Sequence, residues 1–151
     1  MPDLTKAQKT LARFQQLVDA TPPAAAHVRT TDDAWTLTEI IGHLVDSASN
    51  NHQRFARLQH GDLSNFPAYE AEPWVAAQDY DGMDFTTLAT LWVTYNEFIF
   101  HLASHTPESA LDHTWQQKDK RQSLNYLIDD YYAHMQLHVD HYRTRLQEIA
   151  L

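Results

Sequence analysis

The sequence predicts an all-α protein, a four-helix bundle with a long loop between its second and third helices. Only three glycines interrupt the 151 residues, and apolar residues recur at helical rather than alternating spacing in four separate stretches. Four amphipathic helices in a chain of this length favour a bundle around one core. Hydrophobic residues make up 43% of the chain. We therefore expect residues 1–151 to form a single domain.

The first two helices are expected at residues 4–18 and 37–58. The first stops before two successive prolines, which cannot continue a helix. The second has Thr36 or Thr38 as a candidate cap and Gly61 as its stop. The apolar positions that mark them are Leu4, Ala7, Leu11, Phe14 and Val18, then Leu37, Ile41, Leu44, Ala48, Phe55 and Leu58.

The third and fourth helices are expected at residues 85–102 and 128–149. Asp84 is the N-cap predicted for the third, and Pro107 lies just beyond its end. The fourth runs to the C-terminus from a cap near Ser123. Their apolar positions are Phe85, Leu88, Trp92, Tyr95, Ile99 and Leu102, then Ile128, Tyr132, Met135, Val139, Tyr142, Leu146 and Ile149.

Two connections are longer than a compact bundle requires. Residues 62–83 hold "NFPAYEAEPWVAAQDYDG", and residues 105–121 hold "ESALDHTWQQKDKR". Both are expected to be loops, and long ordered loops in compact domains are often functional.

Composition excludes several kinds of site and partner. The formal charge of −9 argues against nucleic acid or an anionic membrane surface as a partner. The chain contains no cysteine, so it has no disulfide, no thiolate ligand and no cysteine nucleophile. No apolar run approaches the roughly 20 residues of a membrane span, and the N-terminus has no apolar signal core. We expect a cytoplasmic protein.

Three histidines occur within eight residues of the last helix, in "YYAHMQLHVDHY". At ~100° per residue, His134, His138 and His141 fall within a ~60° sector at the edge of the apolar face. Histidines there can be solvated surface, buried residues satisfied by neighbouring polar groups, or metal ligands. The spacing alone leaves these alternatives open.

A catalytic metal site usually has three protein ligands, so a third donor must come from another helix. His43, in "WTLTEIIGHLVDSASNNHQRF", lies beside the core position Leu44 and on the flank of the apolar stripe. Asp46, Ser47, Asn50 and Arg54 continue this polar edge. A single core histidine is the alternative interpretation of His43.

These stretches resemble the DinB-like superfamily, and within it the YfiT branch of metal-dependent hydrolases and bacillithiol-transferase-like proteins. The resemblance runs from Trp35 to about Tyr142, and the D-S-x-x-N-x-x-x-R-F spacing from Asp46 to Phe55 is more specific than H-x3-H. It implies a four-helix bundle that holds a divalent ion, zinc or nickel. The ligands it implies are His43, His134 and His138.

The same resemblance places His141 outside the usual ligand trio. We interpret His141 as a polar residue that supports the ligands. A metal-bound histidine commonly donates its other ring nitrogen to a carboxylate or carbonyl, and Asp46 or Asp130, one helical turn from His43 and His134, could accept that hydrogen bond.

In the first long connection, Tyr69, Glu70 and Trp74 approximate the family's Y-D-E-x-x-W pattern. Glutamate replaces aspartate, and Ala71 stands where an acid is usual. The pattern therefore assigns no acid or base to this loop. The other tryptophans are expected to be aromatic core or lid anchors, namely Trp35, Trp92 and Trp115.

Three neutral imidazoles would leave a divalent ion with a charge near +2. Such a charge favours hydrolysis, by lowering the pKa of bound water, or transfer of a thiol that is held as thiolate. The resemblance favours transfer of a low-molecular-weight thiol to a small electrophile. The alternatives are a hydrolase of a small ester or amide and a non-enzymatic metal-binding or ligand-binding protein. We expect a homodimer.

Overall fold

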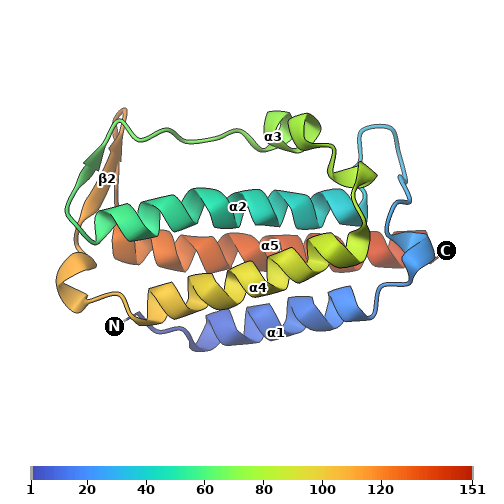
Figure 1. The fold of residues 1–151 in the computed structure, drawn as a ribbon, viewed down its shortest axis with the longest axis horizontal. Helices are drawn as coiled ribbons and strands as arrows, with labels where there is room; N and C mark the ends of the chain where they lie inside the picture. Colours follow the sequence, from blue (N-terminus) through green and yellow to red (C-terminus); the bar gives the residue numbers. More distant parts are fainter. Residues whose placement is uncertain (1, 151) are drawn as a thin grey trace.

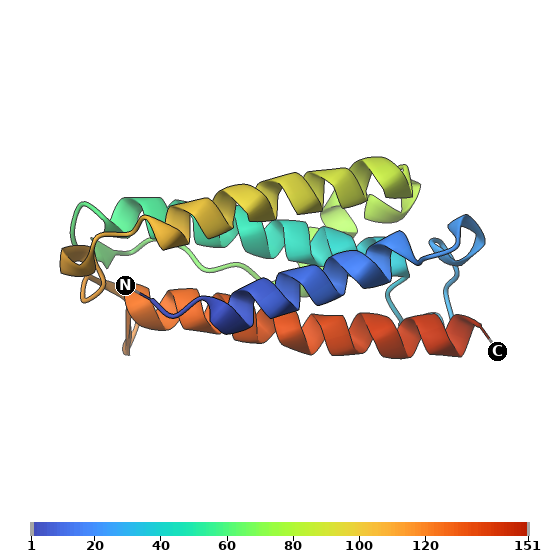
Figure 2. The same ribbon diagram turned by 90° about the horizontal axis from the view of Figure 1, so that it is seen from below.

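A computed structural model describes residues 2–150 and contains the four expected long helices, packed side by side (Figure 1). They are α1 (Thr5–Asp19), α2 (Leu37–Leu58), α4 (Phe85–Ser104) and α5 (Leu124–Ile149). The predicted all-α four-helix bundle is confirmed. Seen from below, α1 lies across the gap between α4 and α5 (Figure 2), and α2 packs against both α4 and α5.

The helix starts follow the predicted capping residues, and of the two candidates for α2 the cap is Thr36, whereas the Thr38 hydroxyl donates to the Ala26 carbonyl. The Thr36 side chain accepts a hydrogen bond from the Glu39 backbone N–H, and the Glu39 side chain accepts one from the Thr36 N–H, which forms a capping box. Asp84 caps α4 in the same way by accepting from Thr87, and Ser123 caps α5 by accepting from Tyr126.

The core is aromatic where α1, α4 and α5 meet. The Phe14 ring packs edge-on against Trp92 at 4.6 Å and against Tyr142 at 5.1 Å between ring centroids. All three side chains are buried. The Tyr142 hydroxyl is paired with the Thr21 hydroxyl at 2.6 Å, whereas the Trp92 indole nitrogen is buried without a hydrogen-bond partner among the described residues.

The first long connection is not purely a loop. It holds β1 (Leu63–Ser64), the short helix α3 (Ala71–Gln78) and a 3₁₀ turn, η2 (Tyr80–Gly82). Because α2 and α4 run in the same direction, the chain must return along the whole bundle between them (Figure 1). We call residues 59–84 the crossover. Its helix α3 lies on α2 and buries Val75.

The second long connection also differs from the predicted loop. After the 3₁₀ turn η3 (Glu108–Ala110), β2 (Thr114–Gln117) and β3 (Lys120–Ser123) form an antiparallel hairpin. β1 pairs in parallel with β2, with Leu63 opposite Trp115. This three-stranded sheet closes the end of the bundle where α2 ends and α5 begins (Figure 1). A third 3₁₀ turn, η1 (Pro23–Ala25), follows α1.

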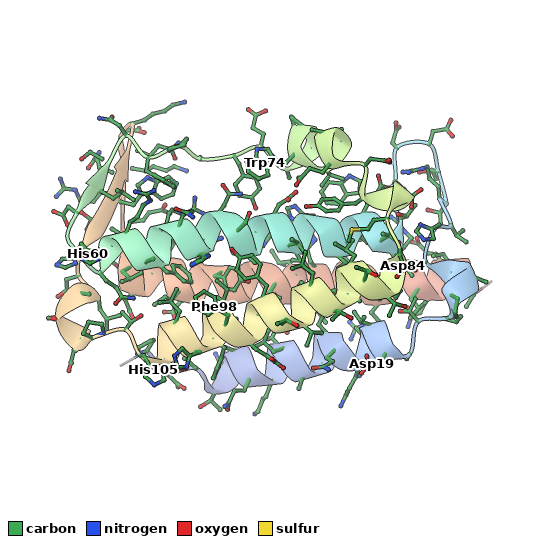
Figure 3. All side chains as sticks on the ribbon, viewed as in Figure 1. Asp19, His60, Trp74, Asp84, Phe98 and His105 are labelled. Carbon is green, nitrogen blue, oxygen red and sulfur yellow. The ribbon has the colours of Figure 1, made fainter. Side chains whose placement is uncertain are left out.

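Side chains fill the space between the crossover and α2 (Figure 3). The Tyr80 ring packs directly on Gly42, where an added Cβ would lie 2.2 Å from the ring. The Tyr80 hydroxyl donates to the Asp46 carboxylate at 2.6 Å, and the Gln78 amide donates to the same oxygen at 2.8 Å. These contacts fix the crossover over the N-terminal half of α2. Across residues 2–150, no helix is both long and apolar enough to span a membrane.

Candidate metal centre

The antiparallel helices α2 and α5 bring three histidines together. His43 Nε2 lies 3.2 Å from His134 Nε2 and 3.1 Å from His138 Nε2. One ring nitrogen from each of the three residues lies within 4.8 Å of the others, so the cluster could hold a metal ion. His43 is 3% exposed, and the two α5 histidines are half-buried. The site is therefore recessed from the surface, and the two α5 histidines are its more exposed members.

These distances can be compared with the geometry of a metal site. Ligand bonds of 2.0–2.1 Å in tetrahedral coordination place neighbouring nitrogens about 3.3–3.4 Å apart. The two nitrogen separations at His43, 3.2 and 3.1 Å, are close to that value. The donor set consists of nitrogen atoms only, with no carboxylate among the three. It suits ions that accept imidazole, such as zinc or nickel, better than magnesium or calcium.

The imidazoles are held neutral, as metal ligands must be. Burial, together with the charges of the neighbouring His134 and His141, lowers the pKa of His43 to about 4. Burial, with the charges of the surrounding histidines, lowers the pKa of His138 to about 3. Burial also lowers the pKa of His134, although the carboxylate of Asp130 acts in the opposite direction. Their nitrogen lone pairs are thus available at neutral pH.

The ring nitrogens that point away from the centre do not form the predicted hydrogen bonds to Asp46 or Asp130. The Nδ1 atoms of His43 and His138 are buried without a hydrogen-bond partner among the described residues. The Asp46 carboxylate instead accepts from Tyr80 and Gln78, and burial raises the pKa of this carboxyl group. The structure therefore places Asp46 in the contact between α2 and the crossover.

Asp130 is exposed and lies one turn before His134 on α5. Within residues 2–150, no hydrogen bond joins its carboxylate to His134, and its influence there is electrostatic. A hydrogen bond from a ligand histidine to Asp46 or Asp130 is thus not part of this structure.

His141 lies beside the trio rather than in it. Its ring centroid is 5.8 Å from that of His138, and it is not among the nitrogens that converge. Burial lowers its pKa, and so does the charge of Arg145 one turn later. Its role as a polar residue that supports the ligands stays a prediction.

Aromatic residues border the centre. The Trp35 ring is 5.0 Å from the His43 ring, and its backbone carbonyl accepts a hydrogen bond from Arg145 of α5. Trp92 and Trp115 are buried elsewhere, as expected for core anchors. In the crossover, Tyr69 packs edge-on against Trp74 at 5.3 Å, and Trp74 is 39% exposed.

Tyr80 and Gln78 were not identified from sequence patterns. Their contact with Asp46 depends on the path of the crossover along α2, and no spacing in the chain encodes that path. The only sequence signal is Gly42 itself, because a glycine inside a helix often marks a close approach by another group.

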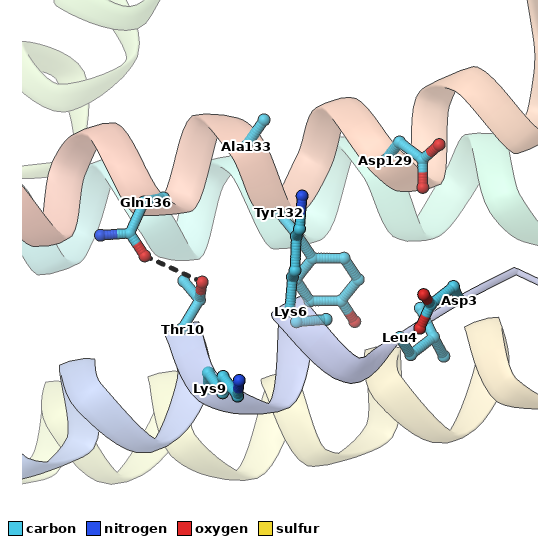
Figure 4. A pocket seen from close by; sticks show the side chains of 10 residues that line it. Asp3, Leu4, Lys6, Lys9, Thr10, Asp129, Tyr132, Ala133 and Gln136 are labelled. Carbon is cyan, nitrogen blue, oxygen red and sulfur yellow. Dashed lines mark hydrogen bonds between the residues drawn. The ribbon is translucent and has the colours of Figure 1, made fainter.

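A groove between α1 and α5 contains none of the predicted ligands (Figure 4). Gln136 lies ~200° around α5 from His134, so the groove opens on the other side of this helix. Its walls are joined by a hydrogen bond from Thr10 to Gln136 of 2.9 Å. It presents no convergent set of titratable groups comparable to the histidines.

The lowered pKa of His43 predicts a pH dependence of stability. The unfolded chain, with an ordinary histidine pKa near 6.5, takes up a proton at a higher pH than the folded state does. Above about pH 6.5, protonation of His43 therefore does not reduce the free energy of unfolding. As the pH falls from 6.5 toward the folded-state pKa of about 4, proton uptake by the unfolded chain lowers this free energy. Between pH 6.5 and 5 the loss from His43 is up to about 2 kcal/mol.

Urea unfolding of chelator-treated protein at several pH values measures this loss. In His43→Asn the free energy of unfolding should depend less steeply on pH, whereas the exposed control His105→Asn should keep the wild-type slope. Equal slopes in all three proteins would contradict the assignment of His43 as a buried neutral imidazole.

Comparisons with known proteins agree with this architecture. A family model described as the DinB superfamily matches residues 6–141. No curated protein shows significant similarity. The structure is similar to that of YfiT from Bacillus subtilis, with a TM-score of 0.82 and 16% identity over 99% of this chain and 90% of that one. YfiT is described as a probable metal-dependent hydrolase with an unusual four-helix bundle topology; at this identity the likeness shows the fold. Since the family model covers most of the sequence, the chain belongs to the DinB superfamily.

Proposed function

We propose that the protein binds one divalent ion through His43, His134 and His138 and uses it to transfer a low-molecular-weight thiol to a small electrophile. The observation that carries this proposal is the convergence of three neutral Nε2 atoms, at 3.1 and 3.2 Å from His43, with no carboxylate in the set. Zinc or nickel is the ion we expect, because both accept imidazole nitrogen.

A divalent ion held by three neutral histidines would favour thiol chemistry. A free thiol of pKa about 8.5 is only a few per cent thiolate at neutral pH. A divalent ion held by neutral ligands supplies the positive charge that keeps a thiol deprotonated. The chain contains no cysteine, so the thiol must arrive as a cosubstrate. In the reaction, the sulfur forms a bond to carbon of the electrophile, the bond to the leaving group breaks, and the thiol proton passes to solvent.

The residues around the histidines have separate tasks in this proposal. Trp35, 5.0 Å from His43, limits access of water on one side. Tyr69 and Trp74, packed edge-on, give the crossover an apolar surface for the electrophile, and the Trp74 side chain is exposed enough to contact it. The contacts of Tyr80 and Gln78 with Asp46 hold the crossover in place.

Hydrolysis of a small ester or amide is the second candidate. It is favoured by the fold similarity to YfiT, which is described as a probable metal-dependent hydrolase. The same neutral ligands serve either reaction, so the substrate decides between them. A protein that binds metal without catalysis is the third outcome. A cytoplasmic location and a homodimer remain predictions from the sequence.

One assay separates these functions. Metal-loaded protein is incubated with an aryl halide and each of several thiols (bacillithiol, glutathione, mycothiol, coenzyme A and cysteine), beside ester and amide substrates. We expect thiol conjugation above the rate of His134→Ala. His105→Ala changes an exposed histidine at the C-terminal end of α4, whose ring lies 4.2 Å from that of His101; it is the matched control and should keep the wild-type rate.

Cleavage of an ester or amide without thiol conjugation would replace the transferase proposal with the hydrolase. Neither reaction, in a protein that binds the ion tightly, would favour the non-enzymatic function.

A further inference from the structure

A strip of polar side chains runs along α2 from the metal centre. His43, Ser47, Asn50 and Arg54 are spaced i, i+4, i+7 and i+11, which places them within a ~60° sector of the helix. Ser47 is 3% exposed and Arg54 is 6% exposed. The strip therefore continues the buried side that carries His43. It ends at a buried cation.

The guanidinium of Arg54 has no hydrogen-bond acceptor in the part of the chain that the structure describes. Its Nε and Nη1 atoms are buried without a partner. No carboxylate of residues 2–150 lies within the 4.0 Å of an ion pair with it. Burial lowers its pKa, and the nearby Tyr69 and Asp130 act in the opposite direction without reaching it. Asp130 is exposed to solvent.

The guanidinium of Arg54 lies over the Trp115 ring, 4.5 Å from its centroid. A cation–π contact stabilises the charge through the flat face of the group. The five N–H donors of arginine, however, point outward in its plane, where a stacked ring cannot accept them. Packing against Trp115 thus orients the guanidinium and leaves the buried Nε and Nη1 donors without an acceptor among the described residues. A buried arginine in this state is unfavourable unless an anion pairs with it.

We propose that Arg54 binds an oxyanion, a carboxylate or a phosphate, carried by the substrate at the end remote from its reacting atom. The fork of an arginine matches both groups by two parallel hydrogen bonds. The α-carbons of His43 and Arg54 are ~16 Å apart along α2. The reach of the arginine side chain shortens this span to the length of a small thiol or its conjugate. Arg54 is then a specificity-determining residue, and the inference rests on the proposed function.

The crossover lies on the other side of the proposed ligand position, opposite the polar strip of α2. Tyr69 is half-buried, and its hydroxyl lies near Ser47 and Arg54, between the two ends of the strip. Trp115 donates its indole N–H to the Phe66 carbonyl at 3.0 Å, which ties the hairpin and the crossover together beside Arg54. A ligand along the strip would lie under residues 66–69 of the crossover, with its reacting atom at the histidines.

The test measures binding rather than turnover, so that it does not depend on the metal. Benzoate, phenyl phosphate and uncharged benzyl alcohol are titrated by calorimetry into His134→Ala protein at constant ionic strength. Carboxylate and phosphate are thereby compared directly. The same titrations are repeated after adding Arg54→Met, Arg54→Lys or Arg57→Met. Arg57 is an exposed arginine one turn later that contacts the Phe66 ring, and it serves as the matched control.

We expect one of the anions, and not benzyl alcohol, to bind to the His134→Ala protein. Arg54→Met should weaken binding by at least about tenfold, Arg54→Lys less, and Arg57→Met should leave it unchanged. Thermal unfolding without ligand provides a second readout. Because Arg54→Met removes a buried, unpaired charge, its midpoint should equal or exceed that of the parent.

A lower midpoint together with unchanged anion binding would assign Arg54 a purely structural role and overturn the proposal. Absence of binding by both anions would overturn it as well. Either result leaves the transferase assay of the metal-loaded wild type as an independent test of the proposed function, and loss of that activity would not by itself affect the anion measurement.

Discussion

His138→Ala is expected to weaken the binding of a divalent ion by more than about 100-fold, whereas His141→Ala should retain the ion with affinity or activity reduced roughly 10–100-fold. Loss of a residue that supports the ligands typically costs 10–100-fold, so loss of a ligand must cost more. The structure separates the two residues, because His138 Nε2 lies 3.1 Å from His43 Nε2 while the His141 ring lies beside the trio.

Zinc and nickel affinities of the two variants, measured by competition with a chromogenic chelator, decide this prediction. The exposed His105→Ala serves as the control for loss of a histidine outside the centre. An equal loss in His138→Ala and His141→Ala would make His141 a ligand. A change in molecular mass of His141→Ala by light scattering would instead assign it to a contact between chains.

Gly42→Ala should destabilise the protein, because the added Cβ would lie 2.2 Å from the Tyr80 ring. Overpacking of this kind costs about 1–3 kcal/mol. Alanine is favoured over glycine inside a helix by about 1 kcal/mol, which offsets part of that cost. The shifted ring would also lose the 2.6 Å hydrogen bond from its hydroxyl to Asp46. A net loss of about 1–2 kcal/mol in the free energy of unfolding is expected.

A double-mutant cycle isolates the cause. In a Tyr80→Ala background the clash is absent, so Gly42→Ala should be neutral or stabilising by up to about 1 kcal/mol. Urea unfolding of the four proteins gives the interaction free energy. The same destabilisation in both backgrounds would show that Tyr80 does not pack on Gly42 as described.

Helical periodicity was sufficient to predict the four long helices. Their apolar stripes face one core, and the predicted caps Thr36, Asp84 and Ser123 each accept the expected backbone hydrogen bond. These features are local, since a cap and an i, i+4 stripe depend only on neighbouring residues. The helices and their caps can therefore be predicted from the sequence alone.

The connections were predicted less well because their structure depends on distant contacts. α3 has eight residues with Pro73 among them, and it packs on α2 through Val75. The strands β2 and β3 are four residues each, and their sequences "TWQQ" and "KRQS" lack an alternating apolar pattern. Their pairing with each other and with β1 could not be recognised from periodicity.

The site was predictable in part for the same reason. Spacing placed His134 and His138 on one side of one helix, but only the resemblance to a family paired them with His43. The contacts around the three histidines could be known only from the structure. The Asp46 carboxylate accepts hydrogen bonds from Tyr80 and Gln78 of the crossover. The Nδ1 atoms of His43 and His138 have no hydrogen-bond partner among the described residues.

The proposed function depends most directly on whether the three histidines bind a metal ion. Elemental analysis of gently purified wild-type protein, before and after dialysis with zinc, nickel or manganese, measures this beside His134→Ala. We predict about one divalent ion per chain in the wild type and a sharp loss in His134→Ala, since two imidazoles rarely hold such an ion alone. Wild-type protein that carries no metal and takes up none of the three would contradict the proposed centre.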